Sequence, residues 1–341
     1  MKSLKMRNPF NPTYSDVPKI FLDTDLRVNE LISTIQESEF ARSFFITGVQ
    51  GSGKTVFLNV VAHKLRDDSN CYHVNVLNQD NLVLSLTKKL LAITETPLQK
   101  IIDSISSVNL KGLNFDLSDP NSEYDVILEK ILDRVRRLAQ VFNELKGENY
   151  PIFILLTGLP DLILDIQNES KLTFLLRSEK IYTLPLKNAD IVSSYVKFFH
   201  FSLSIASQMS TMTKGYSYAF QLLGFLLFNK VAGEIPTQKD LDNIKIEYQL
   251  NLFDNAYQKI FTELSDWDRK YLIAVAGNKK LQEVTKILQK DKVFVAQYRR
   301  QDIERRLIVP AGYGLVRYTL PYFEEYIRQV QDPNSPYYFG Y

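Results

Sequence analysis

The hydrophobic pattern divides the chain into stretches of different character. Residues 1–40 begin with a proline-punctuated extended segment at Asn8–Pro12, and apolar positions at helical spacing predict a helix over Leu26–Ile35. From residue 41 to residue 187, short apolar runs alternate with runs of helical period. Strands are expected there at Ser43–Thr47, Tyr72–Leu77, Pro151–Leu156 and Ile181–Leu184. Helices are expected at Thr55–Leu65, Leu82–Ile93 and Tyr124–Leu145, with a hairpin or loop at Asn109–Ser118. Strands that alternate with helices favour an α/β fold with a parallel sheet.

The C-terminal part of the chain has a helical and then a mixed pattern. Residues 190–264 show helical period without a strand signal and predict a separate all-helical domain. Ser265 and Asp268 then approximate a capping box for a helix that runs to about Ala276. Further helices are expected at Leu281–Leu288 and Phe294–Arg306, followed by strands at Leu307–Val309 and Leu315–Leu320. Three helices and a hairpin are the outline of a winged helix-turn-helix.

These patterns predict five segments. They are an N-terminal arm and helix (1–40), an α/β domain (41–187), a helical lid (188–264), a winged-helix domain (265–330) and a tail (331–341). The tail is rich in Pro, Tyr and Gly and is expected to be loosely held.

One contiguous motif carries specific chemistry. It matches the phosphate-binding pattern G-x-x-x-x-G-K-[ST] at every fixed position: Gly48, Val49, Gln50, Gly51, Ser52, Gly53, Lys54, Thr55. An apolar strand leads into it and a helix leaves it, so backbone N–H groups and the helix N-terminus can face phosphate oxygens. Lys54 is expected to reach the β- and γ-phosphates, and the Thr55 hydroxyl to ligate Mg²⁺. The motif therefore predicts binding of ATP–Mg²⁺ or a close purine analogue.

The acidic motif of a hydrolysing P-loop enzyme is not evident. Four apolar strand residues ending in Asp would normally support Mg²⁺ and orient the attacking water. Val126–Glu129 and Leu162–Asp165 both lie in helical patterns, and Asn114–Asp116 is too short and polar. Either the chain has lost its hydrolytic centre, or an internal segment of about 20–30 residues is absent from the sequence. ATP binding is better supported than ATP turnover under either explanation.

Composition narrows the class of protein only slightly. The single cysteine, Cys71, excludes a disulfide framework and a cysteine-rich zinc site. The basic N-terminus lacks the apolar run of a signal peptide. The longest apolar stretch, Ala219–Phe228, is shorter than the roughly 20 residues of a membrane helix. We expect a cytoplasmic protein that has no membrane partner.

Charge is concentrated near the C-terminus. Residues 269–306 contain 11 Lys and Arg against 4 Asp and Glu, a local net charge of +7, whereas the whole chain carries +2. Such a patch favours salt-dependent binding of nucleic acid. The third helix of the expected winged helix would then enter the major groove of double-stranded DNA. Its candidate contacts are Gln297, Tyr298, Arg299 and Arg300. A charged face used for contact with a protein partner is the alternative.

The order of these motifs resembles a known family. The chain resembles bacterial and archaeal AAA+ ATP-binding proteins related to origin-recognition initiators and to STAND signalling ATPases. The segments that carry the resemblance are, in order, Asn8-Pro9-Phe10, the P-loop, Thr157-Gly158-Leu159-Pro160 after a strand, and Leu172–Arg177. The resemblance covers roughly residues 7–330. It implies a P-loop NTPase sheet with a helical lid and a C-terminal winged helix, and it alone favours ATP over GTP.

The resemblance also implies roles for single residues. Thr157 looks like the polar sensor beside the γ-phosphate, and Arg177 like an arginine finger acting on a neighbouring subunit of a homo-oligomer. The segment Asn8–Pro12 and Ile20 would pack near the purine. Gly215-Tyr216-Ser217 lies where relatives carry a Gly-x-Pro sensor turn, but Ser217 departs from that pattern. Each residue has a plainer alternative, as a turn cap, a surface arginine or a packed arm.

Three functions follow from these features. The first is a nucleotide-controlled switch that couples its ATP state to DNA binding by the winged helix. The second is a STAND-like regulatory scaffold whose terminal module binds a protein partner. The third is an ATP-hydrolysing remodeler, which the missing acidic motif makes the weakest, so the sequence leaves open whether the protein is an ATPase.

Overall fold

A computed structural model describes most of the chain outside its middle. The described residues are 7–13, 18–20, 22, 25–40, 42–66, 142, 147, 152–160, 163, 177–200, 202–231 and 234–340. They belong to two compact units. The sheet unit comprises Arg27–Thr47 and Leu58–Ile181, and the lid unit comprises Met1–Leu26, Gly48–Phe57 and Tyr182–Tyr341.

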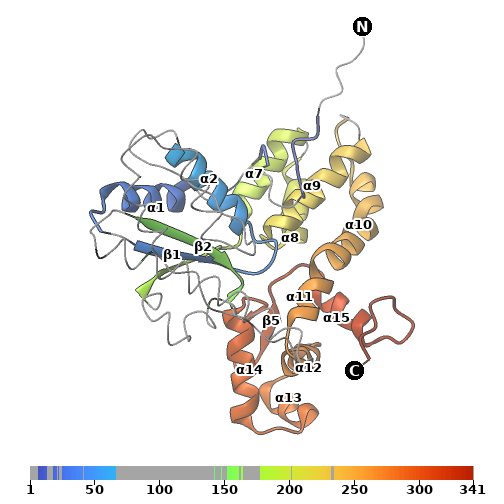
Figure 1. Ribbon diagram of the computed structural model, residues 1–341. Helices are drawn as coiled ribbons and strands as arrows, with labels where there is room; N and C mark the ends of the chain where they lie inside the picture. Colours follow the sequence, from blue (N-terminus) through green and yellow to red (C-terminus); the bar gives the residue numbers. More distant parts are fainter. Residues whose placement is uncertain are drawn as a thin grey trace, which may run out of the picture. The chain divides into compact units, whose positions relative to one another are not determined.

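The sheet unit is built on parallel strands. Strand β1 (Arg42–Thr47) pairs in parallel with β2 (Phe153–Gly158), and β3 (Glu179–Tyr182) completes the order β2-β1-β3 (Figure 1). The register places Phe44 opposite Leu155 and Ile46 opposite Thr157. Helix α1 (Asp25–Glu37) precedes β1, and apolar residues of both elements are buried. The described strands confirm the predicted parallel α/β sheet.

Local predictions in this part agree with the structure where it is described. The expected helix at Leu26–Ile35, strand at Ser43–Thr47 and helix at Thr55–Leu65 correspond to α1, β1 and α2 (Lys54–Arg66). The two later strands are also confirmed. The strand expected from Pro151 begins two residues later, at Phe153, and the strand expected from Ile181 begins two residues earlier, at Glu179. The predictions for 72–77, 82–93, 109–118, 126–129 and most of 124–145 and 162–165 lie outside the described residues.

From residue 188 onward, the lid unit contains a run of helices. They are α7 (Asn188–Phe199), α8 (Leu203–Thr213), α9 (Ser217–Val231), α10 (Gln238–Leu252), a π-helical turn (Phe253–Tyr257) and α11 (Gln258–Glu263). Helix α7 packs on α8, and α9 packs on both α8 and α10. The prediction of helical structure over residues 190–264 is confirmed.

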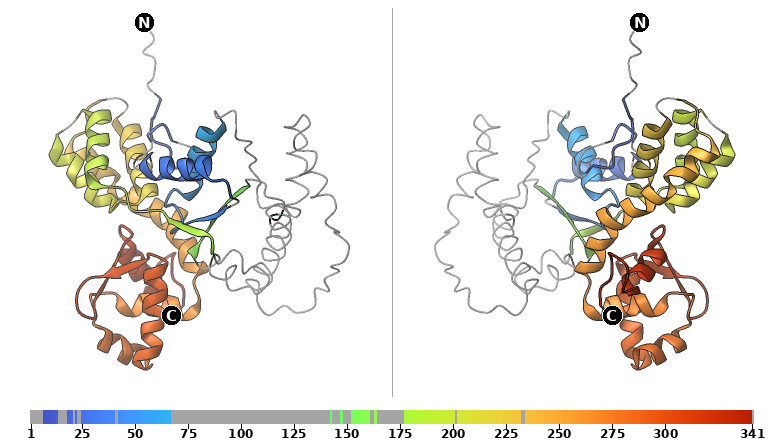
Figure 2. Two further views of the ribbon diagram at one scale, coloured as in Figure 1. Left: turned by 90° about the vertical axis from the view of Figure 1, so that its left-hand side faces the viewer. Right: turned by 90° about the vertical axis from the view of Figure 1, so that its right-hand side faces the viewer.

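The C-terminal module of the lid unit comprises residues 265–340. Its elements are α12 (Asp266–Val275), α13 (Leu281–Leu288), α14 (Lys292–Glu304), strands β4 (Ile308–Pro310) and β5 (Val316–Tyr318), and α15 (Phe323–Gln331). The two strands form an antiparallel hairpin. Ser265 and Asp291 cap α12 and α14 by accepting hydrogen bonds from the N–H groups of Asp268 and Phe294. Figure 2 shows these elements, orange to red, gathered into one group.

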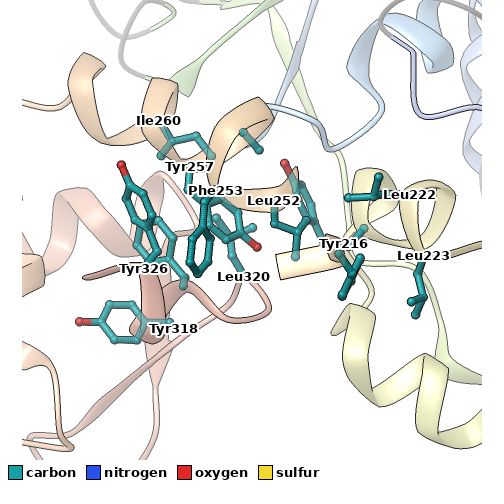
Figure 3. Packing of buried hydrophobic residues seen from close by; sticks show 14 of the residues in the cluster. Tyr216, Leu222, Leu223, Leu252, Phe253, Tyr257, Ile260, Tyr318, Leu320 and Tyr326 are labelled. Carbon is teal, nitrogen blue, oxygen red and sulfur yellow. The ribbon is translucent and has the colours of Figure 1, made fainter. Parts of the chain in front are cut away.

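The lid helices and the C-terminal module share a continuous apolar core. Buried aromatic residues at the junction include Phe253, Tyr257 and Tyr326, and Leu320 after β5 is only 2% exposed. Figure 3 shows these side chains packed with Leu252 and Ile260. Aromatic pairs here have ring centroids 5.2 to 6.0 Å apart, within the range of favourable edge-to-face and tilted contacts.

The expectation of a loosely held tail was wrong. Helix α15 is followed by residues whose side chains return to the core: the Tyr337 hydroxyl donates to Asp254 Oδ1 at 2.7 Å, and the Phe339 ring lies 5.4 Å from that of Phe261. The Phe339 N–H also donates to the Val330 carbonyl at 3.0 Å. The tail's tyrosine and phenylalanine therefore act as anchors, and the Pro and Gly content was a misleading signal.

Candidate nucleotide-binding site

The P-loop motif has the backbone geometry that the sequence predicts. Gly51 and Gly53 have left-handed φ angles of 75° and 88°. The Ser52 N–H donates to the Val49 carbonyl at 3.2 Å, and the Phe57 N–H donates to the Gly53 carbonyl at 2.8 Å, where α2 begins. Glycine adopts these angles without the steric cost that a Cβ would add. The loop therefore turns tightly between β1 and α2.

The P-loop lysine is folded onto its own loop. Its ammonium donates to the carbonyls of Gly48 at 2.9 Å and Val49 at 2.8 Å. Burial lowers the pKa of Lys54 to about 8, while the Glu263 carboxylate at the end of α11 raises it. A phosphate bound at the loop would compete with these two carbonyls for the same ammonium.

Other residues of the lid unit approach the P-loop, which belongs to the same unit. The hydroxyls of Ser52 and Thr183 are 2.6 Å apart, and a Cβ on Gly48 would fall 1.9 Å from the Thr183 hydroxyl oxygen. A Cβ on Gly51 would fall 2.2 Å from the Tyr216 hydroxyl oxygen. A side chain at Gly48 or Gly51 would therefore force Thr183 or Tyr216 to shift.

Thr157 and Arg177 belong to the sheet unit. Thr157 is exposed near the end of β2, the strand that pairs with the one entering the P-loop. Arg177 is exposed and precedes β3. Their roles as a sensor and as an arginine finger stay predictions. Thr55 lies half-buried in the first turn of α2, and its role as a Mg²⁺ ligand is likewise a prediction.

The N-terminal arm packs on the lid. Phe10 is 1% exposed, and its ring lies 5.5 to 5.8 Å from those of Tyr195, Phe199 and Phe220. The Gln221 side chain joins two parts of the arm: it accepts from the Asn11 N–H at 2.9 Å and donates to the Ile20 carbonyl at 2.7 Å. Purine contact by this arm stays a prediction.

In the C-terminal module, packing sorts the basic residues into two groups. Arg305 is turned inward, 2.6 Å from the Asp268 carboxylate and 3.1 Å from that of Asp302, and both aspartates are fully buried. Arg269 and Lys270 pair with Asp266. In contrast, the following basic residues are exposed: Lys280, Lys286, Lys290, Lys292 and Arg300.

The four candidate DNA contacts on α14 differ in exposure. Gln297 and Arg300 are exposed, whereas Tyr298 and Arg299 are half-buried. The Tyr298 ring packs 4.9 Å from Phe294, which itself lies 5.0 Å from Trp267. Val293 on the outer face is 81% exposed, and Tyr313 in the hairpin loop is 99% exposed.

Sequence reasoning missed several residues beside the P-loop. Thr183, Glu263 and Tyr218 had no local signal, because their roles depend on packing between segments far apart in the chain. The sequence marks only Gly215-Tyr216-Ser217, and Ser217 stands where the related sensor turn has a proline. The structure places this turn against the P-loop backbone through hydrogen bonds from Tyr216 and Ser217.

Comparison with solved structures identifies the fold. A Walker-type ATPase of Pyrococcus abyssi matches with a TM-score of 0.57 and 14% identity, over 91% of this chain and 96% of that chain. The Aeropyrum pernix ORC2 protein, solved in ADPNP and ADP complexes, matches with a TM-score of 0.62 and 11% identity, over 94% and 95%. These matches, together with the parallel sheet, show an α/β P-loop NTPase fold.

The sequence comparisons add less. A family profile described as "Domain of unknown function (DUF8462)" matches residues 254–327, from the π-helical turn into α15. No curated protein matches the chain significantly. Among the described residues, no helix combines the length and the apolar character needed to span a membrane.

Proposed function

We propose that the protein is a cytoplasmic ATP–Mg²⁺-binding switch that couples its nucleotide state to the binding of double-stranded DNA. The P-loop domain would span 41–187, the lid 188–264 and a winged helix 265–330. The observation that carries nucleotide binding is the P-loop itself. Its left-handed glycines and its half-buried Lys54 provide the elements that hold phosphate groups in P-loop proteins.

Further roles are proposed at the nucleotide. The Thr55 hydroxyl is suited to ligate Mg²⁺, because it follows the P-loop lysine at the start of α2. Thr157 would sense the γ-phosphate, and Arg177 would reach the nucleotide of a neighbouring subunit. Phosphate release, measured alongside binding, decides whether ATP is also hydrolysed.

DNA binding rests on the outer face of α14. Three exposed residues, Val293, Gln297 and Arg300, follow one another at spacings of four and three, so they share one side of the helix. Gln pairs well with adenine and Arg with guanine in the major groove. Lys290 and Lys292 at the start of the helix would neutralise phosphates. Tyr298 and Arg299 are half-buried and lie more than about 90° round the helix from this face, so they contribute less.

The nucleotide claim is tested with a fluorescent ATP analogue and Mg²⁺. Lys54→Ala removes the ammonium and is expected to weaken binding about 100-fold, since charge-assisted hydrogen bonds contribute roughly 1.5–3 kcal/mol each. Lys64→Ala, an exposed lysine on the same helix that donates to Asn29, should bind as wild type does. Equal affinity of both variants would contradict the proposed site.

The DNA claim is tested with a labelled duplex at increasing KCl concentrations. The logarithm of the affinity should fall linearly with that of salt, by about 0.9 per phosphate neutralised. A double variant, Lys290→Glu with Arg300→Glu, should abolish binding. Lys239→Glu with Lys245→Glu, an equal charge change on exposed α10 positions, should retain most of it. Duplex binding that neither pair alters would remove α14 from the interface.

A scaffold that binds a protein partner is the second candidate. The observation that favours it is apolar exposure on the same module, at Val293 and Tyr313. A partner protein would bury such side chains, whereas a purely electrostatic DNA surface has no need of them. Absence of salt-dependent duplex binding by the wild-type chain would leave this candidate as the better one.

A further inference from the structure

The turn between α8 and α9 is unusually constrained. Lys214 and Gly215 are both left-handed, with φ angles of 47° and 73°. The Leu186 N–H donates to the Gly215 carbonyl at 2.8 Å, and a Cβ on Gly215 would fall 2.7 Å from the Leu186 carbonyl oxygen. Only glycine fits this position, so the turn holds the residues on either side of it in fixed directions.

On one side the turn binds the P-loop backbone. The Tyr216 hydroxyl donates to the Gln50 carbonyl at 2.7 Å, and burial raises the pKa of this phenol, which keeps the proton on the donor. The Tyr218 N–H donates to the Gly51 carbonyl at 3.1 Å. The Ser217 hydroxyl donates to the Ser52 carbonyl at 3.4 Å. Three consecutive residues thus bind three consecutive carbonyls.

These bonds orient the groups that phosphate needs. A peptide unit is planar and trans, so the carbonyl of one residue and the N–H of the next point in opposite directions. Fixing the carbonyls of residues 50–52 therefore fixes the N–H directions of residues 51–53 without using those N–H groups. Any change in these N–H directions when phosphate binds would rotate the peptide planes that the turn holds.

On the other side the turn binds the C-terminal module. The Lys214 ammonium donates to the carbonyl of Leu320, shortly after the hairpin strand β5, at 3.3 Å. Burial lowers the pKa of Lys214, while Glu325 and Glu324 nearby raise it and Arg317 lowers it. The Leu320 side chain is buried with Phe253 and Tyr257 (Figure 3). The hairpin base is therefore connected to the turn by a polar bond and to the lid core by packing.

We propose that Tyr216 and Lys214 are positioning residues that couple phosphate binding at the P-loop to the hairpin of the C-terminal module. Only Gly215 separates the two side chains, and it is held by the Leu186 backbone. A rotation of the Gln50–Gly51 peptide plane would therefore reach Leu320 through a stretch of three residues. The inference rests on the proposed nucleotide binding but not on the proposed DNA binding.

The lid contains a matched control for the tyrosine. Tyr195 is fully buried, and its hydroxyl donates to the Phe220 carbonyl at 2.8 Å, inside the lid and away from the loop carbonyls. Tyr195→Phe removes the same kind of hydrogen bond as Tyr216→Phe. The lysine control is Lys197→Met, on α7 away from the turn, for comparison with Lys214→Met. If Tyr216 and Lys214 had only structural roles, Tyr216→Phe would respond to nucleotide as Tyr195→Phe does, and Lys214→Met as Lys197→Met does.

The experiment is hydrogen–deuterium exchange of the whole chain, with and without saturating Mg²⁺–ADPNP. In the wild type, nucleotide should change exchange in peptides that cover residues 307–322 as well as in the P-loop. Lys214→Met should bind nucleotide within about twofold of wild type, yet lose at least half of the change at 307–322. Tyr216→Phe should weaken binding about two- to tenfold, as expected for one hydrogen bond, and lose the same response at saturation. Both controls should keep the full response.

The outcomes separate this inference from the proposed function. Nucleotide binding without any change at 307–322 in the wild type would overturn the coupling and leave nucleotide binding intact. A wild-type response in Lys214→Met, or an equal loss in Tyr195→Phe, would also overturn it. An exchange response in a protein that binds no duplex would support the coupling and remove only the DNA role. Failure of the wild type to bind nucleotide would overturn both.

Discussion

Lys54 and Arg300 are both cations that we expect to meet phosphate-bearing ligands, but the structure holds them in opposite ways. Lys54 is half-buried in a loop whose shape follows from eight contiguous residues, and its ammonium already binds two loop carbonyls. Arg300 is exposed on one face of α14, and this face is defined by the packing of the opposite face against the rest of the module. A site encoded by neighbouring residues can be recognised in a sequence, whereas only tertiary packing separates the exposed Arg300 from the half-buried Arg299 beside it.

The largest effect should come from breaking the packed side of α14. Arg305→Met leaves the buried carboxylates of Asp268 and Asp302 without their shared cation, which should destabilise the C-terminal module by about 3–5 kcal/mol. Trp267, the single tryptophan, lies against Phe294 in this module, so its fluorescence during urea unfolding reports the change.

Arg300→Met is the matched variant on the exposed side. Its free energy of unfolding should stay within about 0.5 kcal/mol of wild type, because surface changes usually have small effects. If Arg305→Met were as stable as Arg300→Met, the division of the module's cations into structural and ligand-facing groups would be wrong.

The P-loop can be broken without touching a charge. Gly51→Ala forces a Cβ into a left-handed position and against the Tyr216 hydroxyl. The conformation alone costs roughly 1–2 kcal/mol, and the contact requires a further shift of the loop. We expect nucleotide affinity to fall more than tenfold in titrations with the fluorescent ATP analogue.

Gly277→Ala is the control for Gly51→Ala, because it introduces a Cβ at a left-handed residue that lies outside the P-loop. Gly277 has a similar φ of 79°, but a Cβ at this position would meet no described atom within 4 Å. This variant should lose a little stability and keep wild-type nucleotide affinity. An unchanged affinity in Gly51→Ala would mean that the loop does not need its observed geometry to bind nucleotide.

The pH dependence of nucleotide binding should identify Lys54. Only the charged ammonium attracts phosphate, so its contribution is present below its pKa of about 8 and is lost as the pH rises through that value. Phosphate groups, with a second pKa of about 6, no longer titrate in this range. The affinity should therefore fall up to about tenfold per pH unit above 8, as measured by titration from pH 7 to 10.

Glu263→Gln sharpens this prediction. The Glu263 carboxylate raises the pKa of Lys54, so its removal should lower that pKa and move the midpoint to lower pH. Lys259, which pairs with Glu263 at 3.9 Å, offers the control: Lys259→Met should shift the midpoint little. A midpoint near 10 in the wild type would show that the ammonium is not desolvated.

The sequence predicted the individual helices and strands better than the contacts between them. The P-loop, the lid helices and the order of helices and hairpin in the C-terminal module follow from motif and periodicity. Helix α15 could also have been predicted from the sequence. Its buried residues have helical spacing: Phe323, Tyr326, Ile327 and Val330. The inward pairing of Arg305 could not be predicted, since it depends on Asp268 in another helix. The bond from Tyr216 to the P-loop joins residues 166 positions apart, and no local pattern marks it.

The smallest effect concerns the exposed side of α14 and tests whether its charge is localised. Lys292 is exposed at the start of the helix, so Lys292→Met should leave stability unchanged and reduce the salt slope of duplex binding by about 0.9. Lys245→Met on α10 removes another exposed charge, from a helix outside the module. If the chain binds duplex through one face, only the first variant changes the slope. If both change it equally, the duplex responds to the overall charge of the chain, and the helix face has no special role.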